Sequence, residues 1–203
     1  MDAEIKEIYM LNFNNSLGPI EIREQLSSWI KNKLELKQND VLINELGFYN
    51  KNPESSVEST FRADLVLANG RLVGFEIKSK ADNLKRWDRQ MHAYSNVFNE
   101  VWLCCHSSHL KKAIETTAPH IGILMVDDLG SIAVYKPASP NKYIDAFDLT
   151  SFLWKNELQE FARTHNIAIR SSDNKKVIRE QIATLVDISL INSYVLQCLK
   201  TRD

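Results

Sequence analysis

The chain has 203 residues, of which 44% are hydrophobic and 25% are charged, and its formal net charge at pH 7 is −1. These proportions are typical of one globular domain with a small appendage, and the near-zero charge excludes a uniformly basic surface that coats nucleic acid. No apolar run reaches the roughly 18 residues of a membrane-spanning helix, so we expect no membrane partner.

The cysteines and the first residues indicate a reducing compartment. There are three cysteines, and Cys104 and Cys105 are adjacent, which is not the pattern of a disulfide framework. The chain starts with acidic residues, Asp2 and Glu4, rather than with the basic and then apolar segment of a signal peptide. We therefore expect a cytoplasmic protein.

In chain order, the first half of the sequence alternates between helical and strand patterns. Gly18-Pro19 opens a helix with apolar residues at helical spacing as far as Leu34. Asn69-Gly70 is a strong hairpin signal between two strands. Asp82 is expected to cap the next helix, which has an apolar stripe. The predicted strands are 41–48, 61–67, 72–79 and 101–105, and a polar loop is predicted over 50–59.

The second half is predicted to end in helices. It begins with a helix over 109–117 and two strands over 121–127 and 132–136. Two prolines and small residues over 137–141 then indicate a linker. Helical patterns follow over 149–162 and over 177–199, the latter broken near Asp187. We predict an α/β fold in three parts: a core with its extra strands (1–136), a linker (137–148) and a helical C-terminal unit that packs on the core or binds DNA (149–203).

Two neighbouring strands carry charged residues between apolar ones. Asp64 lies in the middle of one strand, and Glu76 and Lys78 share a face of the next. Charged groups in such positions are costly unless they are paired or bind a metal. An aspartate, a glutamate and a lysine together therefore indicate a cation site with a nearby ammonium group. The opposite faces are predicted to be apolar and consist of Ala63, Leu65, Leu67, Val73, Phe75 and Ile77.

The turn decides whether the two carboxylates share a face. A two-residue turn at Asn69-Gly70 would place Asp64 opposite Phe75, and Glu76 would fall on the other face. A three-residue loop over 68–70 places Asp64 opposite Gly74, with Glu76 diagonally adjacent on the same face. We prefer the three-residue loop or an equivalent bulge, because the missing side chain of Gly74 would leave room for an ion.

These residues resemble the PD-(D/E)XK nuclease superfamily. Asp64 is followed, after eleven intervening residues, by Glu76-Ile77-Lys78, and the predicted order of helix, three strands, helix and strand is similar to the core of that superfamily. Ala63-Asp64 stands where Pro-Asp often stands, a departure that keeps the carboxylate. Gln90 and Tyr94 match the QxxxY pattern of RecB-like branches, and their i, i+4 spacing places them on one helix face.

The resemblance covers about residues 20–105 and extends to uncharacterised bacterial members of the superfamily. It implies a restriction-endonuclease-like αβββαβ core with a mixed central sheet, and metal-dependent hydrolysis of phosphodiester bonds in DNA. Asp64, Glu76 and the backbone carbonyl of Ile77 would bind Mg²⁺, with Mn²⁺ as a substitute. Glu45, at the end of the first strand, resembles the extra acidic ligand of the superfamily, and Glu24 competes for that role. No small-molecule cofactor is implied.

The same resemblance assigns catalytic roles. The ion would polarise the phosphate and lower the pKa of a bound water. Lys78 would orient that water or stabilise charge in the transition state, and Gln90 and Tyr94 would complete the catalytic group.

Two basic clusters are candidate contacts for DNA phosphates. One flanks the predicted site and the other precedes and enters the last helical segment, where the pattern faintly resembles helix–extension–helix DNA-binding units. The candidates are Lys80, Lys85, Arg86, Arg89, Lys175, Lys176 and Arg179.

Other interpretations of the same residues stay open. Asp64, Glu76 and Lys78 are also compatible with a structural ion-pair cluster, in which case the protein is a non-catalytic module that binds DNA or a protein partner. The apolar helix stripe explains Tyr94 without a catalytic role. An RNA nuclease would use the same mechanism on a different substrate. The sequence does not distinguish a monomer from a homodimer.

Overall fold

The computed structural model describes residues 17–52 and 54–202 of the chain; the acidic N-terminal residues discussed above lie outside this part. Its helices are α2 (Pro19–Lys33), α3 (Trp87–Ser95), α4 (Leu110–Thr116), α5 (Ala146–Leu149), α6 (Lys155–Thr164), α7 (Lys175–Leu185) and α8 (Ile188–Thr201). Its strands are β1 (Val41–Asn50), β2 (Ser59–Ala68), β3 (Leu72–Lys78), β4 (Glu100–His106), β5 (Gly122–Val126) and β6 (Ile132–Lys136).

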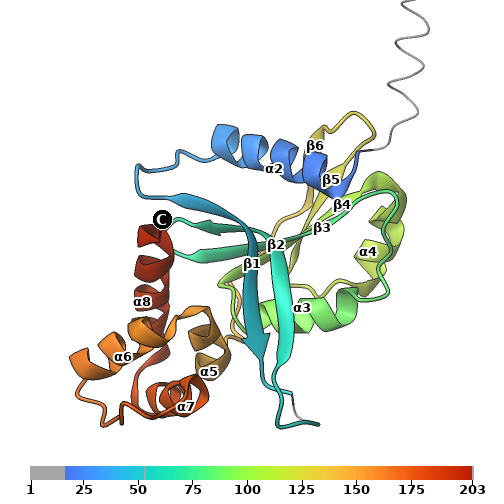
Figure 1. Cartoon of the computed structure of the whole chain (residues 1–203). Helices are drawn as coiled ribbons and strands as arrows, with labels where there is room; N and C mark the ends of the chain where they lie inside the picture. The colour runs from blue at the N-terminus through green and yellow to red at the C-terminus, as the bar shows by residue number, and fades with distance from the viewer. Residues whose placement is uncertain (1–16, 53, 203) are drawn as a thin grey trace, which may run out of the picture.

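The strands form one mixed sheet in the order β1-β2-β3-β4-β5-β6 (Figure 1). The first three strands are antiparallel neighbours, β3, β4 and β5 are parallel, and β6 returns antiparallel to β5. Parallel neighbours require crossover connections, and α3 and α4 supply them between β3 and β4 and between β4 and β5. The predicted α/β class is therefore confirmed.

Helix α2 covers one face of the sheet. Pro19 lies at the first turn, where its missing N–H costs no helical hydrogen bond. Ile22, Leu26 and Ile30 recur at helical spacing and are fully buried or nearly so. They pack on the side chains that the sheet presents to this face, among them Leu65, Leu67, Val73, Phe75 and Ile77.

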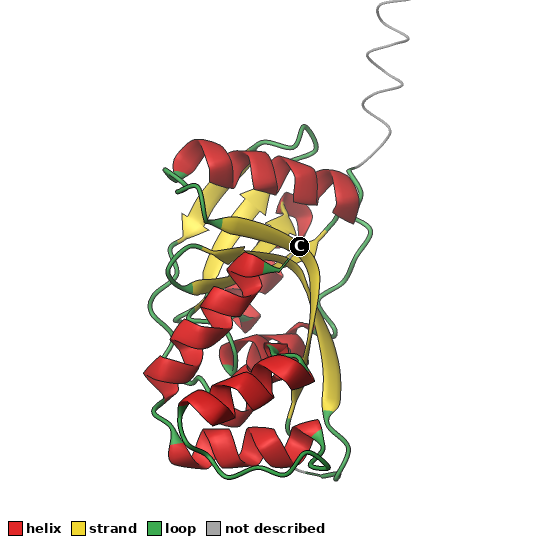
Figure 2. Ribbon diagram, turned by 60° about the vertical axis from the view of Figure 1, so that its left-hand side comes forward, coloured by secondary structure: helices red, strands yellow, loops and turns green. Residues whose placement is uncertain are grey.

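Helix α3 and the C-terminal helices cover the other face (Figure 2). A single apolar core contains Phe48 and Leu103 of the sheet together with Leu149, Ile178 and Val195 of the C-terminal helices. The C-terminal helices therefore pack on the sheet and share its core.

Hydrogen bonds of Asn141 hold the predicted linker against the sheet domain. Asn141 donates from its side chain to the carbonyl oxygens of Ser95, at 2.5 Å, and Phe98, at 2.7 Å. Its own backbone N–H binds the carbonyl of Asn99. The segment ends earlier than predicted, because α5 begins at Ala146.

Several element boundaries differ from the sequence pattern. Asp82 does not cap α3; its carboxylate accepts from the backbone and hydroxyl of Ser79, and the helix begins only at Trp87. The single helix predicted over 149–162 is divided into α5, a 3₁₀ turn and α6. The predicted break near Asp187 is confirmed, because this residue accepts a hydrogen bond from the backbone N–H of Ser189 and caps α8.

The β2–β3 hairpin has a register that neither predicted turn gives. Ala68 pairs with Leu72, so the loop is Asn69-Gly70-Arg71, with Gly70 at φ +103°. The register is displaced by two residues from the predicted one, and an even displacement leaves every side chain on its predicted face. Gly74 lies opposite Val66 rather than Asp64. The prediction that the missing side chain of Gly74 leaves room for an ion beside Asp64 is therefore wrong.

Strand β2 bends where Asp64 lies. Leu65 and Leu67 share a face, as predicted, and this face packs on α2, but Ala63 packs into the core on the opposite side. Figure 1 shows β1 and β2 sweeping through this bend, and the positive φ of 55° at Glu45 marks the irregularity in β1. The prediction that Ala63 shares a face with Leu65 and Leu67 is therefore wrong.

Gly74 is required by close packing. A Cβ atom added there would lie 2.5 Å from the ring of Phe98, which is fully buried. We expect Gly74→Ala to lower the free energy of unfolding by about 1–3 kcal/mol through overpacking. Urea denaturation measures this, with Gly47→Ala as the matched control. A Cβ at Gly47 meets its nearest atom at an ordinary 3.9 Å, so equal losses for the two variants would contradict the packing argument.

In the part of the chain that the structure describes, none of the helices has the length and apolar character needed to cross a bilayer.

Candidate active site

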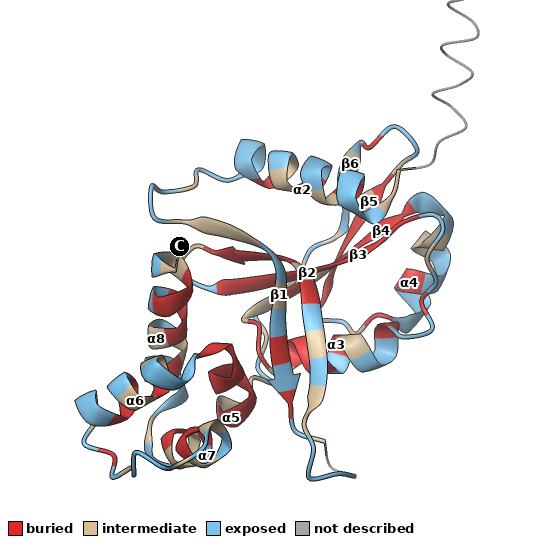
Figure 3. Cartoon of the chain, in the orientation of Figure 1, coloured by how far each residue is buried: buried red, intermediate tan, exposed pale blue. Residues whose placement is uncertain are grey.

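The predicted charged residues meet in one pocket at the bend of the sheet. Asp64 comes from β2, and Glu76 and Lys78 come from β3, which is buried along its whole length (Figure 3). The pocket has a volume of about 370 Å³ and is named here the Asp64 pocket. Its lining consists of Pro19, Thr60, Phe61, Arg62, Asp64, Glu76, Ile77, Lys78, Asp82, Arg86, Arg89 and Gln90.

Glu76 is the centre of a buried hydrogen-bond network. One of its oxygens, Oε1, accepts from Lys78 Nζ at 2.5 Å and from Gln90 Nε2 at 2.6 Å. The other, Oε2, accepts from the Tyr94 hydroxyl at 2.6 Å. Lys78 also donates to Gln90 Oε1 at 3.0 Å. Glu76 and Lys78 are only 2% and 4% exposed, so this network orients both charges without help from bulk water.

Helix α3 presents Gln90 and Tyr94 to Glu76, as the i, i+4 spacing predicts. Burial, together with the negative charge of Glu76, raises the pKa of Tyr94 well above its ordinary value. The phenol therefore keeps its proton and remains a hydrogen-bond donor. Tyr94 also packs edge-on against Phe48, so it belongs both to the apolar stripe and to the polar network.

Asp64 is held differently. Its Oδ2 accepts a 2.7 Å hydrogen bond from the backbone N–H of Ile77. Burial is the main cause that raises the pKa of Asp64 to about 6, and the charge of Glu76 adds to it. The charge of Glu76 thus opposes the ionisation of Asp64, and a cation placed beside both carboxylates would favour the ionised form of Asp64.

The pKa of Asp64 predicts a pH dependence of stability. Between the ordinary value of 3.8 and the folded value of about 6, the folded protein keeps the proton and the unfolded chain loses it. The free energy of unfolding should therefore fall as the pH rises through this window, by about 2–3 kcal/mol in total. Asp64→Asn lacks this titration. Urea denaturation of both proteins at pH 4 and pH 7 in EDTA tests the prediction, and parallel pH profiles would contradict it.

The donor set of the pocket suits a hard cation. Mg²⁺ uses one or two protein carboxylates and keeps several waters, and Asp64 and Glu76 are two carboxylates on one pocket. Glu76 Oε2 accepts one hydrogen bond and retains a lone pair. Among the described residues no group of three or more His, Cys, Asp and Glu side chains could hold a metal ion, so an ion here would have to rely on these two carboxylates, a backbone carbonyl and waters. Ile77, whose carbonyl is the third predicted ligand, also lines the pocket.

The structure does not bring the other candidate acids into the pocket. Glu45 pairs with Arg23 at 3.0 Å and with Arg62 at 3.2 Å. The hydrogen bond from Arg23 and the charge of Arg62 lower its pKa. Its predicted role as an extra metal ligand therefore has no support from this geometry. Glu24 lines a separate surface pocket beside α2.

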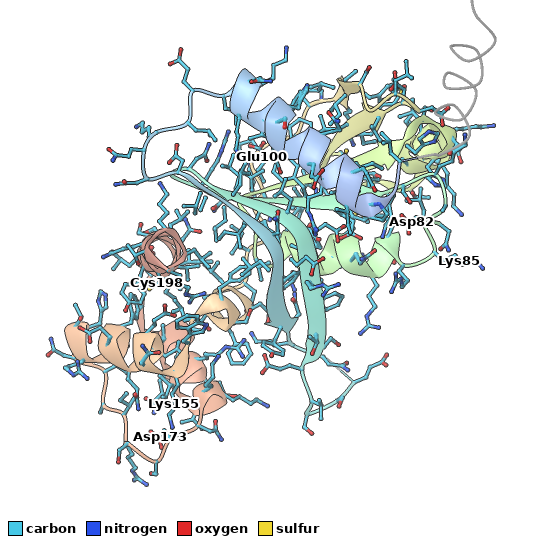
Figure 4. All side chains as sticks on the ribbon, turned by 45° about the horizontal axis from the view of Figure 1, so that its top comes forward. Asp82, Lys85, Glu100, Lys155, Asp173 and Cys198 are labelled. Carbon is cyan, nitrogen blue, oxygen red and sulfur yellow. The ribbon has the colours of Figure 1, made fainter. Side chains whose placement is uncertain are left out.

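The first basic cluster lies partly on the pocket. Arg86 and Arg89 line it. Lys80 is paired with Asp128 at 2.9 Å and is less available to a phosphate. Lys85 is exposed in the loop before α3, and Figure 4 labels it near Asp82 at the edge of the molecule.

The structure leaves fewer residues of the second basic cluster exposed for contact with DNA. Arg179 is 3% exposed and makes a two-oxygen ion pair with Glu58 at 2.8 and 2.9 Å, so this geometry gives no support to its predicted contact with DNA. Lys176 is exposed, and Lys175 is partly exposed. In Figure 4, Asp173, just before this helix, lies far from Lys85, so the two clusters do not form one patch.

Sequence reasoning missed several residues of the pocket. Arg62 could have been found, because it alternates with Asp64 along β2. Phe61 and Thr60 have no such signal, since the bend of β2 turns neighbouring residues toward the pocket together. Pro19 is brought in by the packing of α2 on the sheet.

Comparisons with known proteins give one family. The model of the family described as bacteriophage P4 protein cII matches residues 16–203. Protein cII of Enterobacteria phage P4 is 26% identical over 144 residues, which are 70% of this chain and 54% of that protein, so the chain spans about half the length of this curated relative. Among solved structures, the SPO1766 protein of unknown function from Silicibacter pomeroyi has a TM-score of 0.42 at 15% identity, over 77% of this chain and 99% of that one. Because the family model spans nearly the whole sequence, the chain belongs to the bacteriophage P4 protein cII family.

Proposed function

We propose that this protein is a metal-dependent nuclease of the PD-(D/E)XK type that hydrolyses phosphodiester bonds in DNA. The observation that carries the proposal is the meeting of Asp64, Glu76 and Lys78 in one pocket, with Gln90 and Tyr94 fixing Glu76. The order α2, β1, β2, β3, α3, β4 resembles the order expected of a restriction-endonuclease-like core and supports the proposal. The assignment of this fold to the restriction-endonuclease-like class is part of the same proposal.

Each residue of the site has a separate role in the proposed reaction. Asp64 and Glu76 would hold Mg²⁺, which supplies Lewis acidity toward a phosphate oxygen and an acidified water when bound. The backbone N–H of Ile77 keeps the Asp64 carboxylate in place. Lys78, held by Glu76 and Gln90, presents a positive charge to the phosphate and stabilises the charge that develops in the transition state. Arg86 and Arg89 line the same pocket and supply further positive charge for the DNA backbone.

The direct test is cleavage. Purified protein is incubated with linear, nicked, branched and single-stranded DNA and with RNA, each with Mg²⁺, Mn²⁺ or EDTA. The proposal requires DNA cleavage that either ion supports and EDTA abolishes. Cleavage of RNA alone would keep the chemistry and change the substrate. Failure to cut any of these nucleic acids would contradict the proposal.

A non-catalytic module is the second candidate, and one observation favours it. Glu76 already accepts three hydrogen bonds from protein donors, which is how a structural ion-pair cluster satisfies a buried carboxylate. A module of this kind would bind DNA or a protein partner without cleavage. It predicts that Mg²⁺ has no effect on the thermal stability of the protein, whereas bound Mg²⁺ would raise it.

Salt dependence tests the phosphate contacts separately from catalysis. With a net charge of −1, affinity for DNA has to come from local positive charge. We expect log affinity to fall linearly with log salt, and Arg86→Gln to reduce the slope by about 0.7–0.9. Lys112→Gln, an exposed lysine on α4, is the control. Fluorescence anisotropy in EDTA measures the slopes, and an unchanged slope for the Arg86 variant would remove this residue from the interface.

A further inference from the structure

A second, larger pocket adjoins the Asp64 pocket. This adjoining pocket has a volume of about 560 Å³ and shares Phe61 and Arg89 with the first. One wall is the end of β1, described loop residues after it and the start of β2, and the other wall is α3. The two pockets therefore lie side by side along α3.

The adjoining pocket carries more positive than negative charge. Lys51 and Arg89 line it as two cations, and Glu54 is the one acidic residue among its described lining residues. Lys51 is partly neutralised by Asp145 at 3.1 Å, which leaves the exposed guanidinium of Arg89 as the strongest cation. Asparagine and serine side chains complete the wall, so the lining offers both charge for a phosphate and hydrogen-bonding groups for a base.

Asn50 supplies an unused acceptor in this wall. It is 4% exposed, and its Nδ2 donates to the carbonyl of Ala93 at 3.2 Å. Its Oδ1 has no hydrogen-bond partner among the described residues. This oxygen has almost no exposed surface, so a ligand reaches it only if the amide group turns toward the pocket. A buried acceptor is costly to leave unpaired, which favours that turn when a ligand offers an N–H group. A phosphate offers no such donor, whereas the edges of adenine, cytosine and guanine do.

Phe61 and Arg89 form a stacking platform at the junction of the pockets. The guanidinium lies 5.3 Å from the centre of the Phe61 ring, and Ser59 holds Arg89 in place through a 3.2 Å hydrogen bond. A planar guanidinium stacks on nucleic-acid bases as aromatic rings do. A base can use such a platform only when it is not stacked inside a duplex.

We propose that the adjoining pocket holds one unpaired nucleotide, with its base stacked on the guanidinium of Arg89, which lies over the Phe61 ring, and near Asn50, next to a phosphate in the Asp64 pocket. The substrate is then DNA with a single-stranded segment, such as an end or a flap. This inference rests on the proposed function for its identification of the neighbouring phosphate. The binding of the unpaired nucleotide itself requires no cleavage.

The test compares binding of a labelled single strand with binding of the blunt duplex of the same sequence, by fluorescence anisotropy in EDTA. The wild-type protein should prefer the single strand. Arg89→Ala and Phe61→Leu should each weaken single-strand binding roughly 5- to 150-fold, the range measured for the loss of a stacked base. Arg89→Lys keeps the charge and loses the planar group, so it should recover little of the affinity. Lys112→Ala is the control, and thermal melts show whether each variant is folded.

Cleavage of the same substrates with Mg²⁺ separates this inference from the proposed function. Selective single-strand binding that depends on Arg89, without any cleavage, would support the nucleotide-binding proposal and contradict the proposed nuclease function. Cleavage of duplex and single strand at equal rates, with full affinity in the Arg89 and Phe61 variants, would overturn the pocket and keep the nuclease. Equal affinity of the wild type for single strand and duplex would also overturn it. If Phe61→Leu is unstable, the two Arg89 variants decide, because this side chain is exposed.

Discussion

Asp64→Asn is expected to reduce Mg²⁺-dependent DNA cleavage by at least about 10³-fold, because the loss of a metal ligand removes several kcal/mol of Lewis-acid stabilisation. Asparagine has the shape of aspartate and can still accept the hydrogen bond from Ile77 N–H, so the fold should persist. Single-turnover cleavage measures the rate, and a Mg²⁺ titration followed by thermal melting measures binding. The variant should also lose any stabilisation by Mg²⁺.

The neighbouring residues provide the comparison. Lys78→Met should lower the rate on the order of 10²-fold, as loss of an electrostatic stabiliser does, while the two carboxylates remain. Glu76→Gln should also abolish cleavage, but it leaves the buried ammonium of Lys78 without its charge partner and should destabilise the fold as well. An Asp64→Asn protein that cleaves DNA at the wild-type rate would leave the non-catalytic module as the better account.

The two carboxylates differ because their surroundings differ. Glu76 is matched by an ammonium and two neutral donors, so its charge is compensated inside the protein. Asp64 has one backbone donor and a raised pKa, so its charge is the poorly compensated one. A bound cation would therefore compensate the charge of Asp64 more than that of Glu76. This asymmetry explains why a substitution at Asp64 tests metal binding more cleanly than one at Glu76.

Local patterns predicted the secondary structure well, and register was the weak point. The alternation of apolar and charged residues identified β2 and β3, and Asn69-Gly70 identified their hairpin. The sequence pattern could not select between three-residue loops that begin at residue 68 or at residue 69. Both loops give the same faces, which is why Asp64 and Glu76 share a pocket even though the predicted pairing was wrong.

Residues whose surroundings come from distant parts of the chain were predicted less well. Glu45 has a positive φ and pairs with Arg23, 22 residues away. Arg179 pairs with Glu58, 121 residues away. A basic residue on a helix is usually exposed, and no local pattern distinguishes a buried arginine from a phosphate contact. Tertiary packing decided both cases.

Arg179→Met is expected to lower the free energy of unfolding by about 3–5 kcal/mol, because it leaves the carboxylate of Glu58 unpaired. The guanidinium also donates to Thr150 Oγ1 at 3.1 Å and to the Phe147 carbonyl at 3.0 Å, and it lies 4.0 Å from the centre of the Phe147 ring. Lys176→Met, on an exposed position of the same helix, should change stability by less than about 0.5 kcal/mol. Urea denaturation measures both variants.

A second substitution identifies the cause of the loss. Removing the partner charge in Arg179→Met/Glu58→Gln should restore part of the stability, because the unpaired carboxylate is then gone. Glu58 lies in the loop between β1 and β2, beside the residues that line the adjoining pocket. The ion pair therefore holds that loop against α7. Its loss should release the loop, which lies beside the adjoining pocket, and should therefore also weaken the binding of single-stranded DNA. A stable Arg179→Met protein with reduced affinity and a lower salt slope would instead show that Arg179 contacts phosphate directly.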